Sequence, residues 1–174
     1  LNMLKRALIV VDMQNDFCHP KGSLFLSKNQ EIIPKIKKEI EKARQRKIKI
    51  IFTQDWHKKN DKEFRIWPKH CLEKSWGAKI VKELSPQKED IVIKKRTYSC
   101  FFETSLDQIL KKLKIKKLIF CGCVTNICVL FSVFDAFKLG YEIFLKKDCL
   151  GYLDEKSHQF ALDLMKMCFG AKYV

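Results

Sequence analysis

The sequence lacks any apolar run that approaches the ~20 residues needed to span a membrane. It also shows no internal repeat, linker or low-complexity tract along its 174 residues. Acidic residues are scarce, with 20 Asp and Glu against 35 Lys and Arg, but no aromatic-interleaved basic stripe and no helix-turn-helix pattern accompanies the surplus of cations. We therefore expect a single globular domain over residues 1–174 that binds neither a membrane nor nucleic acid.

The eight cysteines lack the spacing of a structural zinc site, because Cys121 and Cys123 have no matching second pair. Several of the cysteines lie inside apolar runs. The short apolar run near the start of the chain ends at Asp12 and predicts a strand rather than a signal peptide. Reduced thiols and a cytoplasmic location are therefore expected.

Short apolar runs alternate with helical patterns along the chain. Strands are predicted at residues 7–11, 48–53, 91–94, 118–121, 141–145 and 171–174, and helices at 31–47, 105–113, 127–137 and 155–167. The first of these helices has an apolar stripe at helical spacing, which consists of Ile32, Ile33, Ile36, Ile40 and Ala43. The alternation predicts an α/β, Rossmann-like fold of three layers, with a six-stranded, mostly parallel sheet and helices on both faces.

Reactive side chains stand where four of the predicted strands end, namely Asp12, Asp55, Lys95 and, in the turn after the fourth strand, Cys128. Ligands of open parallel sheets bind outside the carboxyl ends of the strands. There, Asp12 can accept the thiol proton, Lys95 can favour an anion, and Cys128 can attack a carbonyl carbon. Each residue taken singly also has an ordinary interpretation: Asp12 can be a loop or cap carboxylate, and Lys95 can be a solvated lysine at the end of a strand.

Cys128 closes the stretch CGCVTNIC, in which Gly122 ends a strand and Thr125 and Asn126 are good helix N-cap residues. This order places Cys128 in the first turn of a helix, where the helix dipole favours a thiolate. Backbone N–H groups in the same turn can hold an oxyanion. The alternative is that Cys128 is a small core residue.

The segment from residue 55 to residue 77 is too long for an ordinary connection and carries a second cluster, made of Asp55, His57 and His70 with Glu63 as a fourth member. One carboxylate and two histidines form a ligand set for Zn²⁺, Fe²⁺ or Mn²⁺. Asp61 is a weaker candidate ligand, and His19 and His158 are interpreted as surface or local structural residues. The alternative to a metal site is that these residues are ordinary polar loop residues or helix caps.

Three aromatic residues, Phe17, Trp67 and Tyr98, flank the two clusters and can stack on a planar ring, or they are ordinary core residues. Together these residues resemble the nicotinamidase/pyrazinamidase branch of the isochorismatase-like cysteine hydrolases. The resemblance runs nearly the full length, through ALIVVDMQNDF, FTQDWH, WPKHC, KRTYS, CGCVTNICV, HQFAL and GAKYV. Cys123 is a departure, because relatives often have valine there.

The resemblance implies a catalytic triad of Asp12, Lys95 and Cys128, and one divalent metal, zinc above iron or manganese, on Asp55, His57, His70 and Glu63. It implies that Phe17 and Trp67 sandwich the ring of nicotinamide, beside Tyr98. A cis peptide bond between Cys123 and Val124 would turn the N–H groups of Val124 and Cys128 toward the oxyanion. The implied activity is hydrolysis of nicotinamide to nicotinate and ammonia in NAD salvage.

Two other functions stay open at this point. One is a cysteine amidase of the same superfamily that acts on a different small amide, such as a ureido compound. The other is a catalytically silent, metal-stabilised binding module. A homo-oligomer is compatible with either function.

Overall fold

The computed structural model describes residues 5–174; the first four residues of the predicted domain lie outside the described residues. Six parallel strands form one sheet in the order β3-β2-β1-β4-β5-β6. Their bounds are β1 Lys5–Val11, β2 Lys49–Asp55, β3 Ile91–Lys95, β4 Ile115–Gly122, β5 Glu142–Leu150 and β6 Lys172–Tyr173. The predicted number of strands, their direction and the Rossmann-like architecture are confirmed.

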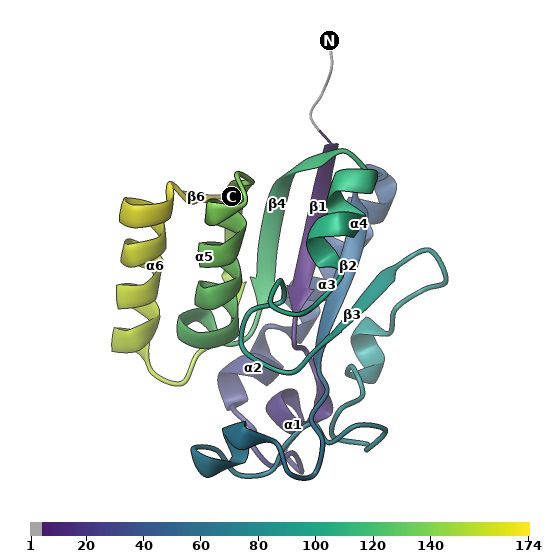
Figure 1. Ribbon diagram of the computed structural model, residues 1–174, viewed down its shortest axis with the longest axis vertical. Helices are drawn as coiled ribbons and strands as arrows, with labels where there is room; N and C mark the ends of the chain where they lie inside the picture. Colours follow the sequence, from purple (N-terminus) through teal and green to yellow (C-terminus); the bar gives the residue numbers. More distant parts are fainter. Residues whose placement is uncertain (1–4) are drawn as a thin grey trace.

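Helices cover both faces of the sheet (Figure 1). The α-helices are α1 Asn15–Cys18, α2 Ser27–Glu31, α3 Ile33–Gln45, α4 Leu106–Lys112, α5 Leu130–Lys138 and α6 Glu155–Phe169. Two 3₁₀ turns, η1 Lys62–Arg65 and η2 Lys82–Leu84, and a π-helical turn, η3 Thr125–Val129, complete the chain. Among residues 5–174, no helix combines the length and the apolar character needed to cross a membrane.

Two apolar cores lie on opposite faces of the sheet. Helix α3 buries its predicted stripe against one face, with Ile36 fully buried, and Pro34 is tolerated because it lies in the first turn of the helix. Helices α4, α5 and α6 pack on the other face around Phe120, Val133 and Leu162. The three layers are therefore those that the periodicities predict.

Strands β4 and β5 are longer than predicted, because Lys117 and Lys146 interrupt the apolar runs but still belong to the strands, where Lys117 pairs with Glu142. These lysines alternate with buried residues such as Leu118 and Leu145. A strand with only one covered face tolerates such charges on its other face.

Gly122 ends β4 where the chain must pass close to β1. Its φ is +112°, and a Cβ there would lie 2.1 Å from the carbonyl oxygen of Val11. Only glycine fits this approach, and the turn that follows carries the chain to Cys128.

Candidate active site

The four residues singled out at strand ends come together at the carboxyl edge of the sheet. Lys95, Asp55 and Asp12 follow or end the neighbouring strands β3, β2 and β1, and Cys128 lies in η3 just after β4. The strand order reverses between β1 and β4, so Asp12 and Cys128 stand on either side of the topological switch point, where open α/β sheets bind ligands.

Lys95 is the centre of this group and is 1% exposed. Its Nζ lies 2.7 Å from Asp12 Oδ2 and 3.5 Å from Cys128 Sγ, and it donates a hydrogen bond to Asp55 Oδ1. Thr53 Oγ1 donates to the other oxygen of Asp12 at 2.6 Å. One carboxylate oxygen each of Asp12 and Asp55 and the sulfur of Cys128 lie within 4.8 Å of one another. One buried ammonium is therefore shared by two carboxylates beside a thiol.

The structure changes the expected protonation of Cys128. Burial raises the pKa of its thiol well above the ordinary value, and Asp12 and Asp55 raise it further against the lowering effect of Lys95. This direction of shift opposes the thiolate that the position of Cys128 in a helical turn predicts. Burial also raises the pKa of Asp12 to about 6, against the attraction of Lys95. A carboxylate with this pKa next to a thiol is suited to take its proton as the sulfur reacts.

The turn that carries Cys128 is a π-helical turn joined directly to α5, and its N-cap is Val124. The predicted N-cap role of Thr125 is wrong: its hydroxyl donates to Gly151 O at 3.0 Å and accepts from His158 Nδ1 at 2.8 Å. His158 is buried and therefore structural, as predicted, but it holds the turn in place from α6. The Cys123–Val124 peptide bond is cis, as the resemblance implies.

The second cluster brings four possible metal ligands together, as predicted: Asp55, His57, Glu63 and His70, whose ligand atoms lie within 4.8 Å of one another. His57 Nε2 is 3.5 Å from Asp55 Oδ2, and His70 Nε2 is 3.4 Å from Glu63 Oε1. Two atoms bound tetrahedrally at ~2.1 Å from one metal lie ~3.4 Å apart. The separations therefore suit one small divalent cation.

The far side of each imidazole fixes which nitrogen faces the cluster. His70 Nδ1 lies 2.7 Å from Pro68 O, which can only accept, and His57 Nδ1 lies 3.0 Å from Asp61 Oδ2. Both Nδ1 atoms therefore carry the hydrogen, and both Nε2 lone pairs point inward. His57 Nε2 is buried without a hydrogen-bond partner among residues 5–174. Asp61, the weaker candidate ligand, instead orients His57 and accepts from Glu63 N.

The charges of this cluster also favour a cation. Burial alone would lower the pKa of His57, but Asp55, Asp61 and Glu63 outweigh burial and raise this pKa to about 9. Burial alone would raise the pKa of Asp55, but Lys95 and His57 lower it to about 2. Three carboxylates around one buried imidazole hold positive charge strongly, and a divalent ion can supply it in place of the proton. The residues thus fit a metal.

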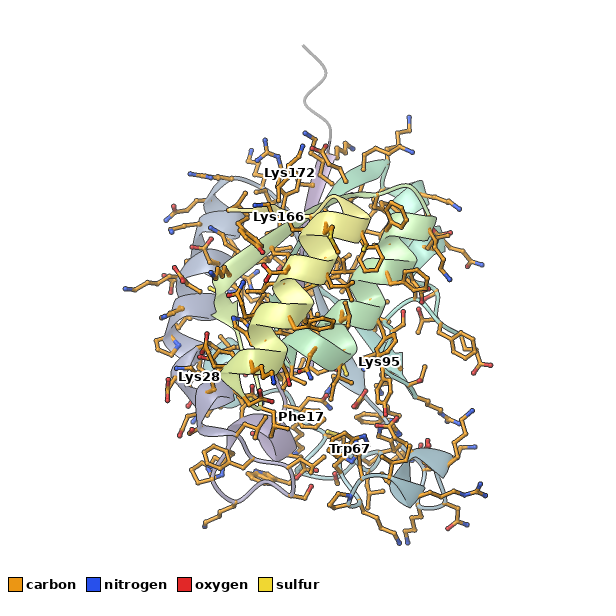
Figure 2. The ribbon with its side chains drawn as sticks, turned by 90° about the vertical axis from the view of Figure 1, so that its left-hand side faces the viewer. Phe17, Lys28, Trp67, Lys95, Lys166 and Lys172 are labelled. Atoms are coloured by element: carbon orange, nitrogen blue, oxygen red, sulfur yellow. The ribbon has the colours of Figure 1, made fainter. Side chains whose placement is uncertain are left out.

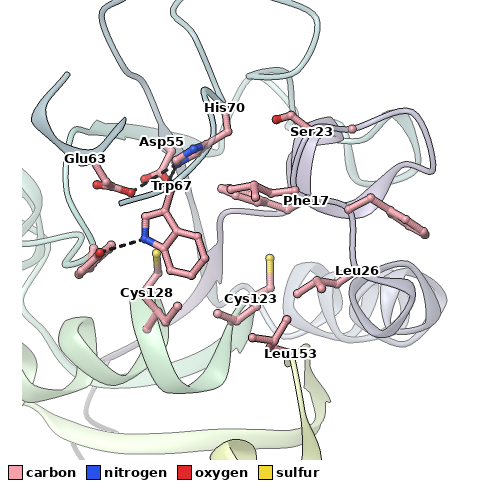
Figure 3. Close-up of a pocket in the computed structure, with 16 residues that line it drawn as sticks. Phe17, Ser23, Leu26, Asp55, Glu63, Trp67, His70, Cys123, Cys128 and Leu153 are labelled. Atoms are coloured by element: carbon pink, nitrogen blue, oxygen red, sulfur yellow. Dashed lines mark hydrogen bonds and ion pairs between the residues drawn. The ribbon is translucent and has the colours of Figure 1, made fainter. Parts of the chain in front are cut away.

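A cavity of about 350 Å³ opens above Cys128 and reaches Asp55, Glu63 and His70. Phe17 and Trp67 stand around this space, and the thiols of Cys123 and Cys128 point into it from below (Figure 3). Trp67 Nε1 donates to Tyr98 OH at 3.1 Å, which fixes the indole. The predicted ring-binding residues therefore line one pocket shared by both clusters.

Gln14 and Thr53 are parts of the site that sequence reasoning missed. The Gln14 amide donates to Asp55 O and Ala78 O, each at 2.9 Å, and accepts from Asp55 N at 2.8 Å. It therefore clamps the end of β2. In the sequence, Gln14 is visible only as a polar residue two positions after Asp12. Polar residues just after a strand are too common to identify such a clamp.

Comparisons with known proteins agree with this geometry. The isochorismatase domain family matches residues 6–172. The ureidoacrylate amidohydrolase RutB of Serratia proteamaculans is 37% identical over 78% of this chain and 65% of its own length. The nicotinamidase of Escherichia coli is 32% identical over 81% of this chain and 80% of its own. The pyrazinamidase of Pyrococcus horikoshii, solved with zinc, has a TM-score of 0.92 and 35% identity, over 98% of each chain.

Proposed function

Because this chain belongs to the isochorismatase family, we propose that it is a cysteine amidohydrolase that converts nicotinamide to nicotinate and ammonia. The observation that carries the proposal is the single pocket that joins the Asp12–Lys95–Cys128 group to a buried metal-ligand cluster. The product, nicotinate, would enter NAD salvage. The Escherichia coli nicotinamidase and the zinc-bound Pyrococcus pyrazinamidase support this assignment.

The reaction begins when Cys128 Sγ attacks the carboxamide carbon and its proton passes to Asp12. The N–H groups of Val124 and Cys128 hold the oxyanion, and Lys95 keeps its charge because the pKa of its ammonium is raised by Asp12 and Asp55 despite burial. Asp12 returns the proton to the nitrogen, ammonia leaves, and a thioester remains. Water, deprotonated by Asp12, then cleaves the thioester to give the acid and the free thiol.

A divalent metal would be held by Asp55, His57, Glu63 and His70, and when bound it would supply an electrophile that binds the pyridine nitrogen. Asp55 joins the two clusters, because its Oδ1 accepts from Lys95 and its Oδ2 faces His57 and His70. The metal side of the pocket would thus anchor the ring, and the Lys95 side would face the carboxamide.

The second candidate is hydrolysis of a ureidoacrylate, which the similarity to the Serratia enzyme supports. That substrate carries a carboxylate. Among the described residues that line the cavity there is no lysine or arginine, whereas Asp55 and Glu63 both line it. Apart from the metal, whose charge Asp55 and Glu63 already offset, the carboxylate would find no cationic partner in this lining, and its desolvation favours the neutral nicotinamide.

The test is ammonia release from nicotinamide by the purified protein, run beside a chelated and dialysed sample. We expect turnover that falls at least ~10-fold on chelation and returns on addition of Zn²⁺, Mn²⁺ or Fe²⁺. Elemental analysis of the His57→Ala variant should show that it has lost the metal. Turnover of ureidoacrylate but not of nicotinamide would move the assignment to the second candidate, and full metal content in His57→Ala would exclude His57 as a ligand.

The pH profile should show an acidic limb that belongs to Asp12. Asp12 must be ionised to take the thiol proton, and burial raises its pKa to about 6. A cation bound nearby acts in the opposite direction, so the limb in kcat/KM should lie at or below pH ~6 and fall ~10-fold per pH unit below it. A limb centred above pH ~7 would point to a base other than Asp12.

A further inference from the structure

A second cavity lies at the opposite edge of the sheet, where the strands begin. It measures about 420 Å³ and is bounded by the end of α3 and by the starts of β1, β4 and β5. Helix α3 lies on this face, where it contacts β1, β2 and β5, while α5 and α6 lie together on the other face (Figure 2). The cavity is the part of the α3 face that this helix leaves open beside β4 and β5.

The floor of this cavity is apolar, which is unusual for a surface so close to many charges. It is formed by Leu8, Ala43, Ile48, Ile119 and Phe144. Of these, Ile48, Ile119 and Phe144 are only partly buried. A cavity of several hundred Å³ with an apolar floor and a few charged groups has the character of a small-molecule site.

Its rim carries more positive charge than the neighbouring carboxylates can neutralise. Glu39 is shared by Lys42 at 2.7 Å and Lys146 at 3.0 Å. Glu142, just outside, is likewise shared by Lys117 and Lys172, each at 3.0 Å.

Two arginines add to this surplus. Arg6 and Arg46 also line the cavity, and neither forms an ion pair with any carboxylate among residues 5–174. The carboxyl end of α3 contributes only about half a negative charge. The rim is therefore strongly cationic over an apolar floor.

We propose that this cavity binds a small organic anion that carries two or more negative charges on a planar apolar body, of the class of a phosphorylated heterocycle. Its ring would lie on Ile119 and Phe144, and its anionic group would be bound by Arg6 and Arg46, whose guanidinium groups suit phosphate. The limited volume of the cavity favours a small ligand over an extended polyanion. The site is separate from the pocket at Cys128, since the six residue-to-residue steps from Arg6 to Asp12 span ~20 Å of extended chain.

The experiment is isothermal titration calorimetry with adenosine 5′-monophosphate as the probe, and with adenosine and inorganic phosphate as partial probes. The site variant is Arg6→Gln/Arg46→Gln. The matched control is Lys111→Gln/Lys112→Gln, which removes the same charge from α4 on the other face. Nicotinamide turnover of each variant verifies folding, because none of these residues belongs to the pocket at Cys128.

We expect saturable binding of the monophosphate with Kd below ~1 mM, weaker binding of both partial probes, and at least a ~10-fold rise of Kd in the site variant but not in the control. An equal rise of Kd in the site variant and in the control would show that the monophosphate is attracted to the positive charge of the whole protein, and would overturn the proposed site. The absence of saturable binding would overturn it too. Tighter binding of a short oligonucleotide, with the same dependence on Arg6 and Arg46, would replace the small ligand by nucleic acid.

Discussion

Replacement of Cys128 with alanine is expected to lower kcat for nicotinamide hydrolysis on the order of 10⁵-fold, because it removes the sulfur that would form the thioester. The rest of the pocket stays, since Cys128 contributes no hydrogen bond to Phe17, Trp67 or the metal-ligand cluster. Nicotinamide should therefore still bind, with Kd within ~3-fold of the parent value by calorimetry. Mass spectrometry of the acid-quenched parent should show a nicotinoyl adduct that the variant lacks.

Cys123 supplies a matched control within the same pocket. It is a second buried thiol whose Sγ lies 3.3 Å from Asp12 O, but it makes no contact with Lys95 among the described hydrogen bonds. Its contact with Cys18 and its burial raise the pKa of the Cys123 thiol. Cys123→Ala should retain turnover within ~3-fold. Loss of turnover in Cys123→Ala, with activity retained in Cys128→Ala, would reverse the assignment of the nucleophile.

The layered fold could be predicted from the sequence because its signals are local. Period-2 and period-3.6 patterns follow directly from which side chains are buried, as in the stripe of α3. The carboxyl ends of β1 and β3 were predicted to within one residue, because Asp12 and the pair Lys94 and Lys95 directly follow apolar runs. The predicted lengths of β4 and β5 were too short, because a lysine on an uncovered sheet face cannot be told from a loop lysine in the sequence.

The candidate site was predictable in its membership but not in its electrostatics. The metal-ligand cluster follows from residue types near one strand end, whereas the role of Asp61 depends on how residues 55–72 fold back through the bridge between His57 and Leu72. The protonated state of the Cys128 thiol depends on burial and on two carboxylates from other strands. Such long-range terms outweigh the local helix dipole on which the sequence argument rested.

Asp12→Asn should lower kcat/KM by about 10³- to 10⁴-fold while the protein remains folded. Asparagine has the shape of the carboxylate, so its oxygen can still accept from Thr53, but it cannot take the proton of Cys128. Lys95 keeps Asp55 as its buried partner. The variant should therefore show a cooperative melt by circular dichroism. Its residual kcat/KM should no longer decrease as the pH falls below ~6, because the group assigned to the acidic limb is gone.

Thr53→Val is the matched control for the role of Asp12 as the base. The Thr53 hydroxyl donates to Asp12 Oδ1 at 2.6 Å and stabilises its ionised form, which lowers the Asp12 pKa against the effect of burial. Its removal should raise this pKa, so the acidic limb should move to higher pH while the plateau of kcat/KM falls by no more than ~10-fold. The two variants thus separate the loss of a base from a shift in its protonation. If Asp12→Asn stays within ~10-fold of the parent at its pH optimum, another group takes the proton and Asp12 serves only to hold Lys95.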